Sequence, residues 1–194
     1  MKKLFFALGA CACIPHILFF VLRKNTNDGK KLSKDIKVWL SRKNHSDYGQ
    51  IKGMAYLLLK LKEFRNLYYH RMGKGTLLFS WVLPRRDTLH LFTPSERIGG
   101  GFYIGHGWGT VVNAYSIGEE CLVAQNTTIG SKDLKTPILG NHVSVWSHCV
   151  IIGGGWILEI THRLDLVPLL LKMYQRIVWL YLLNQPSSRK MANE

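Results

Sequence analysis

The chain has 194 residues, enough for one domain with a helical extension, and 47% of them are hydrophobic, which excludes a disordered protein. Its 26 Lys and Arg outnumber its 12 Asp and Glu, giving a net charge of +14. The excess lies in residues 1–90, which hold 18 basic and 5 acidic residues. No nucleic-acid-binding motif accompanies this charge, so we expect no nucleic-acid partner. An anionic membrane surface or an acidic substrate is favoured, with a solvated helix surface as the plain alternative.

The first predicted element is the apolar run 4–22, which carries no formal charge and has basic residues on both sides. Three placements are open for it: a helix lying on the cytoplasmic leaflet, a helix packed against protein, and a membrane span. Pro15 and His16 interrupt the run, so the first placement is favoured. We therefore expect a cytoplasmic protein associated with the inner face of the cell membrane.

Residues 32–90 have apolar residues at helical spacing, which predicts a basic helical region. Ser33 is the expected N-cap of its first helix. Phe64, Leu67 and Tyr68 are expected to face the core. The stretch 83–87, "LPRRD", breaks the helical pattern and predicts a boundary.

The cysteines indicate neither a metal site nor a disulfide framework, because their spacing fits neither pattern. We therefore expect no metal and a reducing compartment. The four cysteines are Cys11, Cys13, Cys121 and Cys149.

From residue 91 onward, aliphatic residues recur about every six positions, which fits neither a helix nor a hairpin array. A period of six predicts a parallel β-helix whose aliphatic residues point inward. The predicted inward residues are Ile98, Ile104, Val111, Ile117, Val123, Ile129, Leu139, Val145 and Ile151. A second, smaller inward position is predicted two residues earlier, at Cys121, Thr127, Val143 and Cys149.

The step from Ile104 to Val111 is seven, so one extra residue is expected in the turn that contains His106. A break in a strict repeat is where a chain can present a side chain outward. His106 is therefore the leading candidate for chemistry, and a structural corner histidine is the alternative.

The stretches "IGGGFYIGHGWGTVVNAYSIGEECLVAQNTTIG" (98–130) and "PILGNHVSVWSHCVIIGG" (137–154) resemble the hexapeptide-repeat acyltransferases. Within these, the chain is similar to the serine acetyltransferase and polysaccharide O-acetyltransferase branch. The resemblance implies a mainly β protein, a left-handed parallel β-helix after an N-terminal helical region. It also implies a homotrimer that uses acetyl-CoA as co-substrate without a metal.

The resemblance makes His106 the catalytic base, since neutral imidazole can take a proton from a hydroxyl at neutral pH. Neighbouring glycines are expected to allow close approach of the substrate and to offer N–H groups to an oxyanion. The expected substrate-binding residues are Gly105, Gly107, Gly109, Asn113 and Gln125. The expected acetyl-CoA-binding residues are Gly130, Ser147 and His148.

Three positions depart from the serine acetyltransferase pattern. Leu91 replaces the aspartate that orients the base, Gly105 replaces a second aspartate, and Thr136 replaces a substrate-binding histidine. The groups that grip serine are therefore missing, which favours a sugar or glycan hydroxyl over L-serine as acceptor. The alternative is a non-catalytic, membrane-associated remnant of such an enzyme that has lost its last coils.

The hexapeptide pattern stops after Gly154, and residues 155–194 form an atypical tail. The tail can be encoded by codons that, when translated in a shifted frame, give the residues with which the β-helix of the resembling family ends. We therefore interpret the tail as an out-of-frame reading of the last coils. The predicted domains are thus a hydrophobic helix and basic helical region at 1–90, a β-helix at 91–154 and the tail at 155–194.

Overall fold

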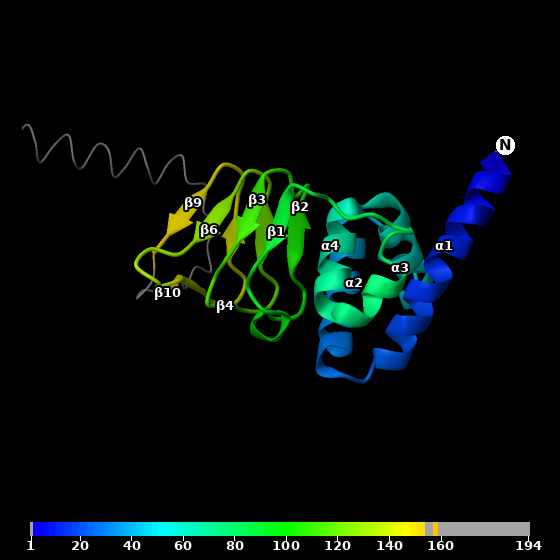
Figure 1. Ribbon diagram of the computed structural model, residues 1–194, viewed down its shortest axis with the longest axis horizontal. Coiled ribbons are helices and arrows are strands. Elements are labelled where there is room, and N and C mark those ends of the chain that lie inside the picture. The colour runs from blue at the N-terminus through cyan, green and yellow to red at the C-terminus, as the bar shows by residue number, and fades with distance from the viewer. Residues whose placement is uncertain (1, 154–156, 159–194) are drawn as a thin grey trace, which may run out of the picture. The chain divides into compact units, whose positions relative to one another are not determined.

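The computed structural model describes residues 2–153 and 157–158, with side chains described from residue 11 to 153 (Figure 1). The described chain begins with four α-helices and continues into a β-helix of short strands. Of the predicted tail at 155–194, only residues 157–158 are described, so its interpretation as an out-of-frame reading lies outside the described residues. The helices are α1 (Lys2–Arg23), α2 (Asn27–Arg42), α3 (Gln50–Lys60) and α4 (Lys62–Met72).

Helix α1 packs one side against the other helices. Cys13, His16 and Phe20 are buried on that side, and the ring of His16 is hydrogen-bonded through Nε2 to the Tyr69 hydroxyl at 2.8 Å. Pro15 lies inside the helix without ending it. Within the described residues, no helix is both long and apolar enough to cross a membrane.

Helix α2 begins earlier than the sequence predicted. Thr26 is its N-cap, because the Thr26 hydroxyl accepts a hydrogen bond from the Gly29 N–H at 3.1 Å. The expected cap, Ser33, instead lies inside the helix and donates to the Gly29 carbonyl at 2.9 Å. The Ser33 prediction was wrong because the helix extends about two turns farther upstream, through mostly polar residues.

The helices enclose an apolar core. Trp39 of α2, Leu57 of α3 and the predicted core residues Phe64, Leu67 and Tyr68 of α4 are fully buried. The last three were correctly predicted from helical spacing. After α4, a 3₁₀ turn, η1 (Lys74–Leu78), and an irregular segment that contains residues 83–87 lead to the first strand.

Ten strands form three parallel sheets. The chain visits the sheets in turn and completes three coils, so the predicted architecture, a left-handed β-helix preceded by helices, is confirmed. The first sheet has β2 (Tyr103–Gly105), β5 (Leu122–Ala124) and β8 (Ser144–Val145). The second has β1 (Leu89–Leu91), β3 (Thr110–Val112), β6 (Thr128–Gly130) and β9 (Val150–Ile152). The third has β4 (Ser116–Ile117), β7 (Ile138–Leu139) and β10 (Ile157–Leu158).

The predicted inward residues are buried with one exception. Val111 was predicted to point inward, but Val112 is the fully buried residue and pairs in register with the inward Ile129. The step from Ile104 to the inward valine is therefore eight residues, and the next step, to Ile117, is five. Two residues rather than one are inserted after β2. The register of β3 is therefore shifted by one position, so that the Val112 side chain points inward and the Val111 side chain points outward.

The smaller inward positions agree with their prediction. Cys121, Thr127, Val143 and Cys149 are all buried in the β-helix. Burial raises the pKa of the Cys121 and Cys149 thiols, which keeps them protonated and unreactive. These cysteines are therefore core residues.

The β-helix continues past the predicted end at 154. Strand β10 pairs in parallel with β7, and Leu158 takes the register position of Leu139. The step from Ile151 to Leu158 is seven residues, so strict six-residue counting missed this strand.

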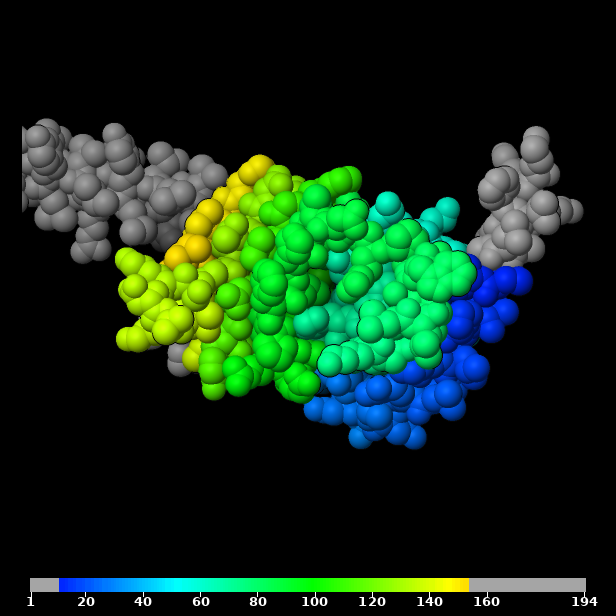
Figure 2. All heavy atoms as spheres, viewed as in Figure 1, coloured from blue at the N-terminus to red at the C-terminus, as the bar shows by residue number. Residues whose placement is uncertain are grey.

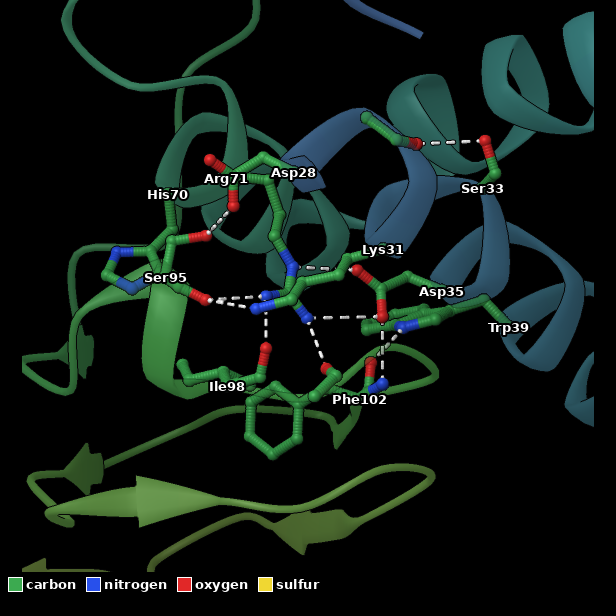
Figure 3. Close-up of polar contacts among 12 residues, drawn as sticks. Asp28, Lys31, Ser33, Asp35, Trp39, His70, Arg71, Ser95, Ile98 and Phe102 are labelled. Atoms are coloured by element: carbon green, nitrogen blue, oxygen red, sulfur yellow. Dashed lines mark hydrogen bonds and ion pairs between the residues drawn. The ribbon is translucent and has the colours of Figure 1, made fainter. Parts of the chain in front are cut away.

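A buried ion pair joins the helices to the first coil (Figure 3). The Arg71 Nε and Asp35 Oδ2 atoms are 3.0 Å apart, and neither side chain is exposed. Arg71 also donates to the carbonyls of Ser95, Ile98 and Gly99, while Asp35 accepts the Phe102 N–H at 2.8 Å. These bonds fix the segment that leads into β2.

Candidate active site

His106 lies at the centre of a tight turn directly after β2. The Gly107 N–H donates to the Gly105 carbonyl at 2.7 Å, which closes a three-residue turn around the histidine. The φ angle of His106 is 62°, in the left-handed region that non-glycine residues rarely occupy. Glu120, Asn126 and His148 have similar φ angles, so this conformation is typical of corners in the β-helix.

The His106 side chain lines an open cleft of about 580 Å³ on the outer face of the β2–β5–β8 sheet. The end of α2 and the residues just after it form the opposite wall. The cleft is therefore shared between the β-helix and the helical region. Its lining residues are Ser41, Arg42, Asn44, Tyr103, Gly105, His106, Leu122, Ala124, Gln125, Trp146 and Ser147.

The cleft combines aromatic surfaces with polar side chains. Tyr103 is held between Trp39, at 4.6 Å between ring centroids, and the Arg42 guanidinium, 4.9 Å from the Tyr103 centroid. Trp146 supplies a second aromatic ring, and no carboxylate is among the lining residues. The cleft is thus suited to a neutral or anionic polar molecule with an apolar face.

Three of the predicted site residues lie with His106 in this cleft. Gly105 and Gln125, predicted to bind the acceptor, line it, as does Ser147, predicted to bind acetyl-CoA. A Cβ at Gly105 would lie against Ala124 and Tyr103, which also line the cleft.

The other predicted acceptor-binding residues lie elsewhere. A Cβ on Gly107 would meet Leu89 and Glu63, so this glycine faces the packed junction, and its N–H is already engaged in the turn. Gly109 is a corner residue with φ 55°, packed against Asn126. Asn113 follows β3 on a different sheet, where its N–H donates to the Ile129 carbonyl.

The remaining two predicted acetyl-CoA-binding residues also lie outside the cleft. Gly130 ends β6, and a Cβ there would approach Ile152. His148 is an exposed corner residue with φ 62° whose N–H donates to the Gln125 carbonyl at 3.2 Å.

No described residue forms a hydrogen bond with the His106 imidazole. Leu91, expected to replace an orienting aspartate, is half-buried in β1. The nearest carboxylate that supports the turn is Glu63, whose Cβ lies against Gly107 and whose Oε2 is 3.0 Å from Arg86 Nη2. The Arg86 guanidinium lies 3.9 Å from the Trp108 ring centroid. Glu63 and Arg86 thus contact the turn at Gly107 and Trp108.

Sequence reasoning missed two sets of cleft residues. Tyr103, Leu122, Ala124 and Trp146 flank the inward residues of one sheet, so the repeat itself contained the signal that they share the face next to His106. The residues from the end of α2, including Arg42, carried no such signal, because helix packing alone places them there.

Among the described residues, no group of three or more His, Cys, Asp or Glu side chains is placed to hold a metal ion.

No protein-family model matches this sequence, and no curated protein matches it. Solved structures similar to this chain include three serine acetyltransferases. Neisseria gonorrhoeae serine acetyltransferase, in complex with serine, has 17% identity and a TM-score of 0.47 over 72% of this chain and 69% of the other. Entamoeba histolytica serine acetyltransferase 1 has 14% identity and a TM-score of 0.37 over 82% and 75%. Isoform 3 from the same organism, in complex with cysteine, has 16% identity and a TM-score of 0.32 over 73% and 61%.

These identities and TM-scores are too low to transfer an activity, a substrate or a site residue.

Proposed function

We propose that this protein is an acetyl-CoA-dependent O-acetyltransferase in which His106 is the general base. The observation that carries the proposal is the position of His106. Its backbone is held in a three-residue turn, and its imidazole lines a cleft large enough for a substrate.

The proposed reaction needs one proton acceptor and two bound substrates. Neutral His106 takes the proton of an acceptor hydroxyl as its oxygen attacks the carbonyl carbon of the thioester. The new C–O bond forms, and the C–S bond of acetyl-CoA then breaks. The imidazolium returns the proton to the departing thiolate, which releases free CoA. Because the Gly107 N–H is engaged in the turn, the Ser147 hydroxyl and the Gln125 amide are the proposed donors to the oxyanion.

The composition of the cleft supports a sugar or glycan hydroxyl as acceptor. Tyr103 and Trp146 offer aromatic faces for a sugar ring, and Asn44 and Gln125 offer amide groups for its hydroxyls. The cleft lining contains no carboxylate to bind the ammonium group of L-serine, which remains the second acceptor to test.

The proposal includes a homotrimer, which is implied by the resemblance to hexapeptide-repeat acyltransferases. It also includes a cytoplasmic location beside the cell membrane, where a membrane-linked glycan would be within reach.

The test is release of free thiol from acetyl-CoA with a panel of sugars, glycans and L-serine. His106→Asn keeps a residue that tolerates positive φ and should lower turnover by about 10²–10⁴-fold. His142→Asn is the matched control, because His142 is also exposed with φ 58° but lies outside the cleft. Near-normal turnover of His106→Asn would overturn the role of the base. No thiol release by the unaltered protein would leave the non-catalytic remnant as the better explanation.

A further inference from the structure

Helix α1 has an apolar stripe that the other helices leave uncovered. Leu22 is 74% exposed, and Ile14, Leu18 and Val21 are also exposed, at the helical spacing of a single face. This face lies opposite the buried side with Cys13, His16 and Phe20. Since that side is packed against protein, α1 is free to meet a partner along only half of its circumference.

The segment after α4 extends this apolar stripe. It lies against the flank of α1, because Phe79 packs edge-on against Phe19 at 5.6 Å and Gly75 contacts the same ring. Leu78 is 85% exposed and Trp81 is 79% exposed. Figure 2 shows this blue-green segment beside the dark blue residues of α1.

Together these residues form a surface that we name the α1 surface. It joins side chains more than 50 positions apart in the sequence, on a helix and on a separate turn. Contiguous exposed apolar side chains of this kind are rare on soluble monomers unless they bind a partner. The α1 surface consists of Ile14, Leu18, Val21, Leu22, Leu77, Leu78 and Trp81.

The sequence segments that contribute to the α1 surface carry only positive charges, because residues 1–27 and 64–86 contain no Asp or Glu. Lys24, Lys74 and Arg85 are exposed at its border. Apolar side chains surrounded by cations, with a tryptophan among them, are typical of a protein face that inserts into the headgroup region of a bilayer.

A small pocket of about 180 Å³ lies within this border. Lys74 and Arg85 line it together with the Ser80 and Thr76 hydroxyls, and Leu77 lies at its edge. Two cations in one concavity suit a phosphate group, and no carboxylate is among the lining residues. The adjacent exposed leucines would then meet the acyl chains attached to that phosphate.

We propose that the α1 surface docks on an anionic lipid membrane, with Leu77, Leu78 and Trp81 inserted beside α1 and a lipid phosphate bound between Lys74 and Arg85. The cationic border decides for anionic lipid over a second copy of this chain, because two such borders would repel each other in a symmetric dimer. This inference extends the predicted membrane role of residues 4–22 to a turn that the sequence did not single out.

The direct test is cosedimentation of the full chain with phosphatidylcholine vesicles and with vesicles that also contain phosphatidylglycerol. Tighter binding to the anionic vesicles, reduced by added salt, is expected. Leu78→Ser with Trp81→Ser should weaken this binding at least about tenfold, because the apolar area that inserts is lost. The matched control is Leu134→Ser with Phe92→Ser, which removes exposed apolar residues from the β-helix and should leave binding unchanged.

The phosphate pocket is tested separately by Lys74→Glu with Arg85→Glu. Each basic residue near an anionic surface contributes about fivefold to binding, so reversing both should lower affinity for the anionic vesicles by about 25-fold or more. Binding to neutral vesicles should change little. Inorganic phosphate distinguishes the two possible sources of the phosphate group. A pocket for free phosphate would bind inorganic phosphate without vesicles, whereas a pocket for a lipid headgroup would be occupied only when vesicles are present.

Two results would overturn the proposal. One is equal vesicle binding by the α1-surface variant, Leu78→Ser with Trp81→Ser, and by its control, Leu134→Ser with Phe92→Ser. The other is a change of oligomeric state in the α1-surface variant with no vesicle binding by the unaltered chain, which would assign the surface to a second copy. The vesicle assay contains no acetyl-CoA, so its outcome is independent of the acetyl-transfer test.

Discussion

The β-helix and the helical region bury their apolar residues in different ways. In the β-helix, each inward residue sits above its equivalent in the previous coil, as Ile104, Val123 and Val145 do. In the helical region, the core gathers side chains from separate helices, such as Trp39 and Phe64, whose ring centroids are 5.2 Å apart. The first arrangement repeats a local rule, whereas the second depends on long-range packing.

The candidate site lies between the β-helix and the helical region. The β-helix presents His106 from an irregular turn, and the end of α2 presents Arg42 across the cleft. The buried pair of Arg71 and Asp35 holds the two regions in this relation. The repeating coils of the β-helix thus position His106, and the helical region forms the opposite wall of the cleft.

The largest expected effect comes from breaking the junction. Asp35→Ala leaves the Arg71 guanidinium buried without its carboxylate, which should lower the free energy of unfolding by about 3–5 kcal/mol. Urea unfolding measures this change. Glu119→Ala is the control, because the Lys34–Glu119 pair also links the two regions but is more than half exposed and should contribute about 0–1 kcal/mol. Equal losses in the two variants would mean that the junction does not depend on the buried pair.

The next effect tests the register of the β-helix. Val112→Ala removes buried methyl groups from the inward column and should cost about 1.5–3 kcal/mol. Val111→Ala makes the same change one residue earlier on the outward face and should cost about 0.5 kcal/mol. Thermal unfolding of both variants compares the two positions directly. A larger loss for Val111→Ala would restore the simple six-residue count and contradict the observed register.

Much of the β-helix could be predicted from sequence because each coil repeats one local requirement, an inward aliphatic residue. Eight of the nine predicted inward residues, such as Ile129, are buried as expected. Val111 failed where the insertion around His106 breaks the repeat. That same break pointed to His106 itself, so the irregularity that misplaced one core residue also revealed the candidate base.

The helical region shows the limit of such reasoning. Helical spacing identified Phe64 and Leu67 as core residues, since one buried face is a local property. It did not reveal that Arg42 lines the cleft or that Glu63 lies under Gly107, because both depend on how the helices meet the first coil. The exposed Leu78 and Trp81 were missed for the same reason.

A smaller effect is expected at the contact between the two regions. Glu63→Gln keeps the shape of the side chain but removes the charge paired with Arg86, which should loosen the Gly107–Trp108 part of the turn. Because misplacing a catalytic group by a fraction of an ångström is costly, we expect kcat to fall about tenfold with KM for acetyl-CoA unchanged. Glu96→Gln, an exposed carboxylate on the first coil, is the control. Unchanged kcat in Glu63→Gln would show that the β-helix holds the turn without the helices.

The smallest expected effect distinguishes the two regions by their response to pH. Burial lowers the pKa of His16 and His70 below the ordinary 6.5, and both histidines belong to the helical region. As pH falls through about 6.5, the unfolded chain therefore binds protons that the folded chain does not, so the free energy of unfolding decreases. The helical region should lose stability first, which hydrogen exchange of its helices can follow between pH 7.5 and 5.5. His16→Gln should flatten this pH dependence, because it removes one of the two buried imidazoles, whereas His142→Asn on the β-helix should leave it unchanged. A pH dependence that survives in His16→Gln and disappears in His142→Asn would place the sensitivity in the β-helix instead.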